Sequence, residues 1–447
     1  MIRESVLIEK SRLKKIVGLS LPIVGGMLAQ NIMSLIDTAM VGRLGDAALA
    51  SVGVGTFLFL LIMSLAMGVS AGVQALVARR IGEGNPDLTG HDLNAGILIS
   101  SCVGLVLAVI GYLMLPTLFP LVSQDPAVTA KGLAYLRPRI PSMIFVGVNI
   151  SFRGYWNGIS KPKFSLLTVL VAMVVNVFFN YLLIFGNLGF PRLETAGAGL
   201  ATTIAIFSGV LTNLGLGLRY ARKNGFLHGL PDKQRLQTLI RVSLPESIRH
   251  FFMFLGLVVF FAIVGLLGTK NLAAFNVILN IMLVALLPAM GIGSAALTLV
   301  SQALGRKEPA DAKKWGWEVA RFGAGALLLF SLCVVPFAET IVGLFIPDAS
   351  TISIAASPLR IIGLFMWIEA FGMILSFALI GAGATKIVMI NSLLIQWCLS
   401  LPLNWFWGVY LGYGLFGMFL NGFFMVLLRT SIFTFIWHKE RWSRIKI

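Results

Sequence analysis

The chain has 447 residues, of which 57% are hydrophobic and 12% are charged. Soluble domains average about 45–50% apolar and about 25% charged residues, so this composition excludes a soluble protein and indicates a membrane protein. The formal net charge of +17 is divided among many short connections. A nucleic-acid-binding protein gathers its basic residues on one face or tail, so that class is disfavoured too.

Apolar stretches of about 20 residues, long enough to cross a ~30 Å hydrocarbon core as helices, recur from one end of the chain to the other. No large soluble domain fits between them. We predict an all-α membrane protein whose twelve spans lie at 16–41, 49–77, 94–116, 133–156, 165–186, 197–219, 240–267, 272–301, 322–346, 355–382, 387–411 and 414–437.

Basic residues concentrate in alternate connections. They precede the first span and follow the second, fourth, sixth, eighth and last spans, whereas the intervening loops GDAAL, SQDPAV and GFPRLETAG hold very few. By the positive-inside rule, the basic loops and both termini are cytoplasmic, as expected for a multi-pass protein of the cytoplasmic (inner) membrane. The first residues lack the pattern of a removable signal peptide.

The sequence matches itself when it is shifted by 223 residues. Because this shift contains six spans, an even number, the repeat is parallel and predicts two six-helix bundles related by an axis along the membrane normal. Secondary transporters use such repeats and bind substrate near mid-membrane, although duplication also builds channels and scaffolds. We expect lobes at residues 1–222 and 241–447, joined by a cytoplasmic linker at 223–240. The matched pairs are Pro22 with Pro245, Gly45 with Gly268, Gly82 with Gly305, Pro86 with Pro309, Asp125 with Asp348, Leu136-Arg137 with Leu359-Arg360, Gly158 with Gly381, and Lys163 with Lys386.

The two halves differ at Asp37, which falls opposite Phe260. An ionised Asp near a helix centre costs about 2.5–3.5 kcal/mol on insertion scales, so such residues usually face a cavity or a partner. Asn176 and Asn180 lie four residues apart in the fifth span and therefore share a helical face. Burial would favour the neutral form of Asp37 and a nearby cation its ionised form, which would make the group a coupling site. The alternative is that these residues only join helices by hydrogen bonds.

Several other intramembrane residues are candidates for a substrate cavity or, equally, for interhelical hydrogen bonds. Pro22 interrupts the first span and provides a bending point or a static bend. Glu369 is a second deep carboxylate and could serve the substrate cavity, whereas Glu246 lies near a helix N-terminus and is expected to be structural. The polar candidates are Gln30, Asn31, Tyr135, Asn149, Thr202 and Thr203.

The segments LIDTAMVGRLG, NVFFNYLLIFG and GAGLATT, with the two-by-six layout, resemble the multidrug and toxic compound extrusion (MATE) transporters over essentially the whole chain. The resemblance implies two lobes around a V-shaped central cleft and antiport of organic cations against protons or sodium ions. It implies that Asp37 couples transport to the cation, together with Asn176, Asn180 and, less closely matched, Tyr135 and Thr202.

The resemblance leaves the coupling ion open. Glu369 matches an acid of the bacterial sodium-type branch, but two further positions of that site are Met253 and Phe365 here, so the second-lobe sodium site is incomplete. Protons are therefore favoured. A sodium ion held by the oxygens of Asp37, Asn176, Asn180 and Thr202 is also chemically reasonable.

The sequence predicts a transporter that exports lipophilic, often cationic drugs, works as a monomer and needs no cofactor. A flippase for a lipid-linked precursor is the main alternative; its pyrophosphate substrate would require several membrane-embedded basic residues, whereas the arginines here are expected at or near span ends. An intramembrane enzyme is disfavoured, because the four His residues lie at or outside span ends and no HExxH-type motif occurs.

Overall fold

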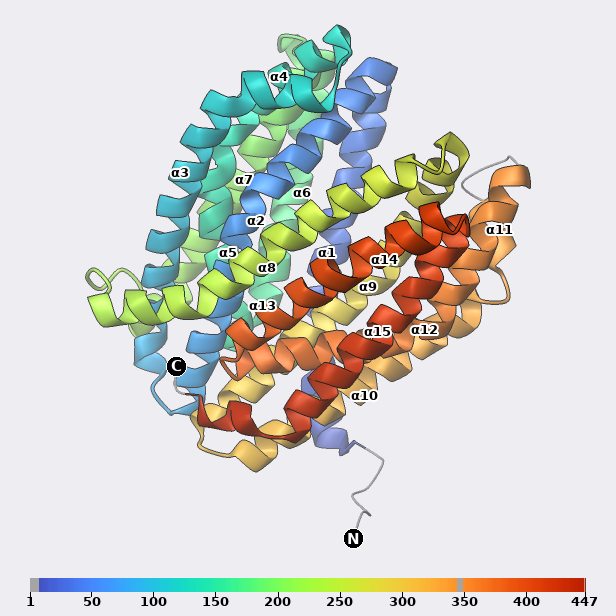
Figure 1. Ribbon diagram of the computed structural model, residues 1–447. Coiled ribbons are helices and arrows are strands. Elements are labelled where there is room, and N and C mark those ends of the chain that lie inside the picture. Colours follow the sequence, from blue (N-terminus) through green and yellow to red (C-terminus); the bar gives the residue numbers. More distant parts are fainter. Residues whose placement is uncertain (1–7, 344–348, 446) are drawn as a thin grey trace. The chain divides into compact units, whose positions relative to one another are not determined.

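The computed structural model describes residues 8–343, 349–445 and 447, and every regular element in these ranges is a helix. Short 3-10 turns join several of the α-helices (Figure 1). The α-helices are α1 (Lys10–Gly42), α2 (Asp46–Gly82), α3 (Thr89–Val122), α4 (Pro126–Arg139), α5 (Met143–Gly158), α6 (Pro162–Phe185), α7 (Glu194–Tyr220), α8 (Lys233–Gly265), α9 (Thr269–Gly305), α10 (Pro309–Val334), α11 (Ala338–Gly343), α12 (Ala349–Gly381), α13 (Thr385–Leu393), α14 (Leu401–Trp405) and α15 (Gly414–His438).

The prediction of an all-α membrane protein is confirmed, since eleven helices of the described chain are long and apolar enough to cross a membrane. The predicted span at 133–156 falls in two shorter helices, α4 and α5, which a 3-10 turn at Ile140–Ser142 separates. The sequence explains this break, because Pro138 and Pro141 each lack a backbone donor for a helical hydrogen bond. The break leaves Arg139 as the last residue of α4.

The internal repeat is visible in the helix boundaries. The bounds of α8 and α9 are those of α1 and α2 moved by 223 residues, at both ends of both helices. The loop glycines agree as well: Gly45 has φ 101° and ψ 172°, and Gly268 has φ 94° and ψ 169°. Residues with a side chain rarely adopt this conformation, so each copy needs glycine before its second helix. Asp348, the predicted match of Asp125, lies outside the described residues.

The repeat changes register by one residue in its fifth span. The second copy contains a π-helix at Leu394–Ser400, and a single π-helical turn accommodates one extra residue within a continuous helix. Before it, Lys163 matches Lys386 with an offset of 223; after it, an offset of 224 places Asn180 opposite Asn404. The ungapped alignment of the sequence therefore misses this second pair of equivalent residues.

The chain forms two compact units. We call residues 25–251 the first unit, and residues 1–24 with 252–447 the second unit. The divisions fall inside helices: α1 divides two residues beyond Pro22, and α8 divides six residues beyond Pro245. The segment Lys10–Val24 therefore packs with the second copy of the repeat, and the segment Lys233–Phe251 packs with the first.

Each unit is built around one central helix contact. In the first unit, α5 packs against α2 and α3, while α7 packs against α4 and α6. In the second unit, α12 packs against α9, α10 and α15 (Figure 1). Small residues permit this close approach; a side chain at Gly104 of α3, for example, would collide with the backbone of α5 at Met143. Membrane helices commonly pack through such small residues.

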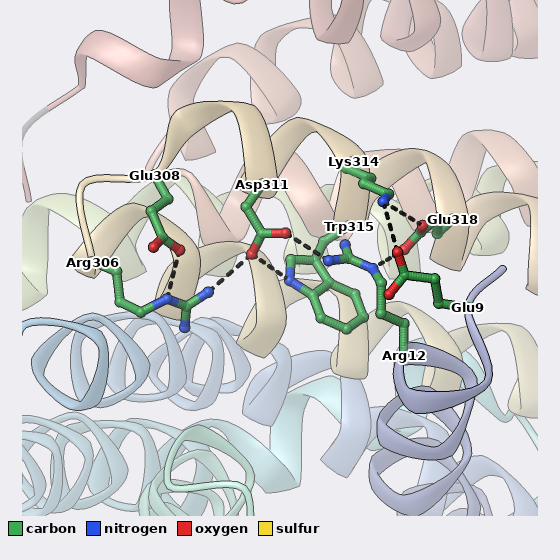
Figure 2. A network of polar contacts seen from close by, with 8 residues as sticks. All are labelled: Glu9, Arg12, Arg306, Glu308, Asp311, Lys314, Trp315 and Glu318. Atoms are coloured by element: carbon green, nitrogen blue, oxygen red, sulfur yellow. Dashed lines mark hydrogen bonds and ion pairs between the residues drawn. The ribbon is translucent and has the colours of Figure 1, made fainter. Parts of the chain in front are cut away.

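Two arginines at equivalent repeat positions attach the exchanged helix segments. In the second unit, Arg12 of α1 places Nη1 2.6 Å from Asp311 Oδ1 of α10, and its Nε pairs with Glu318 of the same helix. Figure 2 shows this network, in which the Arg12 guanidinium also lies over the Trp315 ring at 3.5 Å from its centroid.

The equivalent arginine of the other repeat makes the corresponding contact in the first unit. Arg235, 223 residues after Arg12, lies near the start of α8. Its Nη1 is 3.1 Å from Asp92 Oδ1 of α3, and Asp92 is 1% exposed. Each arginine thus joins the first helix of one repeat to the third helix of the other.

Candidate functional site

The candidate site lies within the first unit and centres on Asp37 of α1. Asp37 is half-buried, and the amide nitrogen of Asn180 on α6 donates a hydrogen bond to its Oδ1. The same nitrogen lies 3.1 Å from Asn176 Oδ1, one helical turn earlier. Asn176 and Asn180 are both 0% exposed. The predicted acid and the predicted amide pair are therefore in direct contact.

The amide network continues to α7. Asn176 Nδ2 lies 3.5 Å from Thr202 Oγ1, and Thr202 in turn donates to the carbonyl oxygen of Ala198 at 2.9 Å. Thr202 is 6% exposed. Three helices thus contribute one polar chain that ends at the carboxylate. One acceptor stays unused: Asn180 Oδ1 is buried and has no hydrogen-bond partner in the described part of the chain.

A second polar group lies on α2 and α4 of the same unit. Tyr135, 3% exposed, brings its hydroxyl to 2.9 Å from Thr56 Oγ1. Arg139 follows Tyr135 by one helical turn and donates from Nη1 to the same Thr56 oxygen at 3.1 Å. Its guanidinium centre lies 4.6 Å from the centroid of Phe59 and 5.0 Å from that of Tyr135. Both aromatic faces favour a cation at this position.

Arg139 connects this second group to Asp37. The two side chains interact electrostatically, although within the described residues they do not form a direct ion pair. Arg139 Nε is buried and accepts no described hydrogen-bond partner. As the last residue of α4, the cation also lies at the negative end of a helix dipole. The site therefore holds one carboxylate and one guanidinium that do not touch.

Other predicted residues of the first half lie apart from this cluster. Asn149 is committed to helix packing, since its Nδ2 donates to the Ile206 carbonyl at 2.9 Å and its Oδ1 accepts from Asn213 at 2.9 Å. Gln30 is exposed and Asn31 is half-buried, both on α1. Thr203 donates to the carbonyl of Pro138 at 2.9 Å and so attaches α7 to the end of α4. Pro22 lies inside α1, in the part that belongs to the second unit.

Glu369 lies in the second unit and is paired. Arg429 of α15 donates from Nη2 to Glu369 Oε2, and the Glu369 side chain is 13% exposed. Glu369 is therefore a neutralised carboxylate, in contrast to Asp37. Glu246 is 1% exposed and binds Arg249 through both carboxylate oxygens.

The second unit contains an amide cluster that resembles the one around Asp37. Asn421 of α15 donates to Asn404 Oδ1 at 2.7 Å, and Asn404 Nδ2 lies 3.3 Å from Ser400 Oγ. Asn404 and Asn421 are both 2% exposed. Asn404 and Ser400 are the repeat equivalents of Asn180 and Asn176 at the offset of 224. Phe260 occupies the position equivalent to Asp37, so only the first unit combines the amides with a carboxylate at this position.

Sequence reasoning missed Arg139, Thr56 and Arg429. The two arginines were expected at or near span ends, where basic residues are common. For Arg139 a signal exists, because it follows Tyr135 by four residues and must share its helical face. No comparable sequence signal identifies Thr56 or pairs Arg429 with Glu369.

Comparisons with known proteins agree with this architecture. The sequence matches the model of the MatE family over residues 22–182 and 245–406, two segments that correspond to the two copies of the repeat. The chain belongs to the MATE family. This family is a transporter family, which supports a role in transport rather than catalysis.

Relatives in several bacteria match almost the whole chain. A probable multidrug resistance protein NorM of Burkholderia mallei is 30% identical over 420 residues, which cover 90% of this chain and 87% of that protein. A probable multidrug resistance protein NorM of Thermotoga maritima is 26% identical and covers 96% of this chain and 93% of that protein.

Solved structures share the fold of this MATE protein. The Vibrio cholerae MATE transporter VcmN in its bent form has a TM-score of 0.87 at 20% identity and covers 96% of this chain and 97% of that chain. A MOP superfamily transporter from Pyrococcus furiosus, described as having a binding pocket of reverse polarity, has a TM-score of 0.85 at 22% identity, with coverage of 97% and 96%.

Proposed function

We propose that this MATE protein is a cation-coupled antiporter that exports lipophilic, often cationic compounds by alternating access. Membership of the family and the similarity to NorM proteins, which are named for multidrug resistance, support export of drugs. We place the protein in the cytoplasmic membrane with both termini inside, working as a monomer. Proton coupling is favoured and sodium coupling is the alternative.

One observation carries the proposal. Asp37 is half-buried in a membrane helix, and an amide network holds it without neutralising it. The acids Glu246 and Glu369, in contrast, are each bonded to an arginine. A carboxylate without a bonded counter-ion can bind and release a transported cation, and a carboxylate that is already paired is a poor site for that exchange.

The coupling would act through α1. When Asp37 is ionised, the Asn180 amide hydrogen bond is charge-assisted, and when Asp37 carries a proton this bond weakens. Such a change would alter how α1 packs on α6, and Pro22 provides a point where the helix can bend. Moving one charge across 100 mV supplies about 2.3 kcal/mol, roughly fortyfold in substrate gradient.

The test is ethidium efflux from proteoliposomes with separately imposed proton and sodium gradients. Asp37→Asn keeps the side-chain size and the partners but removes the charge, so efflux should fall to the background of protein-free vesicles. Asp46→Asn, which removes an exposed acid from the start of α2, is the matched control and should leave efflux unchanged. Normal efflux by Asp37→Asn would show that the coupling assignment is wrong.

A flippase for a lipid-linked precursor is the second candidate. Such a substrate carries pyrophosphate and requires unpaired basic residues inside the membrane. Arg249 and Arg429 are instead bonded to Glu246 and Glu369, which leaves fewer cations for a pyrophosphate group. Restoration of growth in a strain that lacks its own precursor flippase, without resistance to drugs, would reverse the order of the two candidates.

A further inference from the structure

The cluster around Asp37 contains a cation of its own, and this cation bears on which ion the transporter uses. Arg139 interacts electrostatically with Asp37 but does not bond to it. Thr56, Phe59 and Tyr135 fix the guanidinium by one hydrogen bond at 3.1 Å and two aromatic faces at 4.6 and 5.0 Å. Because a guanidinium keeps its proton in proteins, this positive charge is permanent.

The hydrogen bonds of the cluster also suit an anion better than a metal ion. Hard cations bind to several oxygen ligands at once. Here Asp37 Oδ1 and Asn176 Oδ1 both receive hydrogens from the Asn180 amide, and Thr202 Oγ1 faces the Asn176 amide nitrogen at 3.5 Å. The one buried oxygen without a described partner is Asn180 Oδ1. Sodium binding would therefore require the amide network to be rearranged.

We propose that Arg139 determines the coupling ion by excluding sodium from the Asp37 cluster. The inference rests on the proposed function, since it assigns a role to a residue of the same site. Arg139 supplies the positive charge that balances ionised Asp37, which is the charge that a bound sodium ion would otherwise supply. A proton can still reach Asp37, because it forms a covalent O–H bond with one carboxylate oxygen and needs no shell of ligands.

The size of the effect follows from Coulomb's law. At an effective dielectric constant of about 20, a fixed unit charge within about 10 Å changes the affinity of a monovalent cation by about tenfold or more. Replacing Arg139 by a neutral residue should therefore raise sodium affinity by at least that factor. The substitution leaves Asp37, Asn176, Asn180 and Thr202 available as oxygen ligands.

The experiment measures sodium binding and sodium-driven transport in the same proteins. Purified wild type, Arg139→Gln and Arg139→Lys are compared for ethidium efflux under a sodium gradient and for melting temperature in sodium chloride against choline chloride. We expect Arg139→Gln to gain a sodium-dependent rise in melting temperature and sodium-driven efflux. Wild type and Arg139→Lys should show neither, because both keep the positive charge.

The control is Arg137→Gln, which removes an exposed arginine from the same helix. This variant should behave like wild type. A sodium response of the wild type, or no sodium response of a folded Arg139→Gln protein, would overturn the inference. If Arg139→Gln does not fold, the wild-type and Arg139→Lys measurements still test it, since sodium should stabilise neither.

The two proposals fail in different ways. If Asp37→Asn abolishes efflux but Arg139→Gln gains no sodium response, the coupling site stands and the role of Arg139 is wrong. If Asp37→Asn transports normally, the proposed function itself fails, whatever Arg139 does.

Discussion

The Arg12 network allows a prediction about stability that does not depend on transport. Arg12 bonds to Asp311 and Glu318, whose side chains are 26% and 8% exposed, and it stacks on Trp315. Arg12→Met keeps a long side chain over the indole ring but leaves the Glu318 carboxylate with only Lys314, at 4.0 Å. Removing one partner of a buried pair typically costs about 3–5 kcal/mol. Since Arg12 itself is 12% exposed, we expect about 3 kcal/mol.

The assay is unfolding of the purified protein in mixed detergent micelles, followed by tryptophan fluorescence. The matched control is Arg306→Met, which breaks an ion pair with Glu308 at 2.7 Å whose side chains are 41% and 52% exposed. Exposed pairs contribute about 0–1 kcal/mol, so this variant should lie close to wild type. The double variant Arg12→Met/Glu318→Leu should recover most of the loss, because it leaves no unpaired charge.

The equivalent arginine of the other repeat should be less critical. Asp92, the partner of Arg235, also has Arg80 Nε at 3.7 Å. Arg235→Met therefore leaves Asp92 with a second cation and should cost less than Arg12→Met. The reasoning is refuted if Arg12→Met unfolds at the same detergent fraction as Arg306→Met, or if Arg235→Met is the more damaging of the two.

Three further predictions concern transport. Asn180→Ala should lower ethidium efflux at least about tenfold, because it removes the hydrogen bond to Asp37, which as a bond to a charged group contributes about 1.5–3 kcal/mol; its repeat equivalent Asn404→Ala should leave efflux within about twofold of wild type, and equal losses would contradict the asymmetry. Glu369→Gln should leave ethidium efflux unchanged, since Arg429 already neutralises this acid; a loss of efflux at unchanged folded yield would place Glu369 in the transport path. Pro22→Ala should slow efflux without abolishing ethidium binding, which fluorescence anisotropy measures, and an unchanged efflux rate would show that bending at this residue is not needed.

The parts of the fold that the sequence predicts are those set by local chemistry. Helix lengths follow from apolar stretches, and the repeat follows from residues such as Gly45 and Gly268, whose backbone conformation leaves little choice of residue. Likewise, an acid and an amide pair at helical spacing were enough to bring Asp37 and Asn180 together, because a polar group in a membrane must find a polar partner.

What the sequence did not predict depends on contacts between helices distant in the chain. Arginine near the end of a span has two outcomes, a position at the membrane surface or a position inside a helix bundle, and only packing separates them. Arg139 lies inside because α2 offers Thr56 and Phe59. The second amide cluster escaped notice because the π-helix at Leu394–Ser400 moves the register by one residue, which an ungapped comparison cannot follow.

The comparison of the two units explains why one carboxylate carries the argument. Both units keep buried amides on the helices of the fifth and sixth spans, so the amides alone are part of the duplicated scaffold. Helix packing would then be satisfied without any charge, as it is in the second unit, where Phe260 replaces the acid and packs on Phe275 at 5.0 Å between ring centroids. The first unit adds Asp37 and, on a neighbouring helix, Arg139 as an unbonded opposite charge. Because such a pair destabilises a membrane bundle unless it is used, its presence in only one copy of the repeat is better explained by ion exchange than by packing.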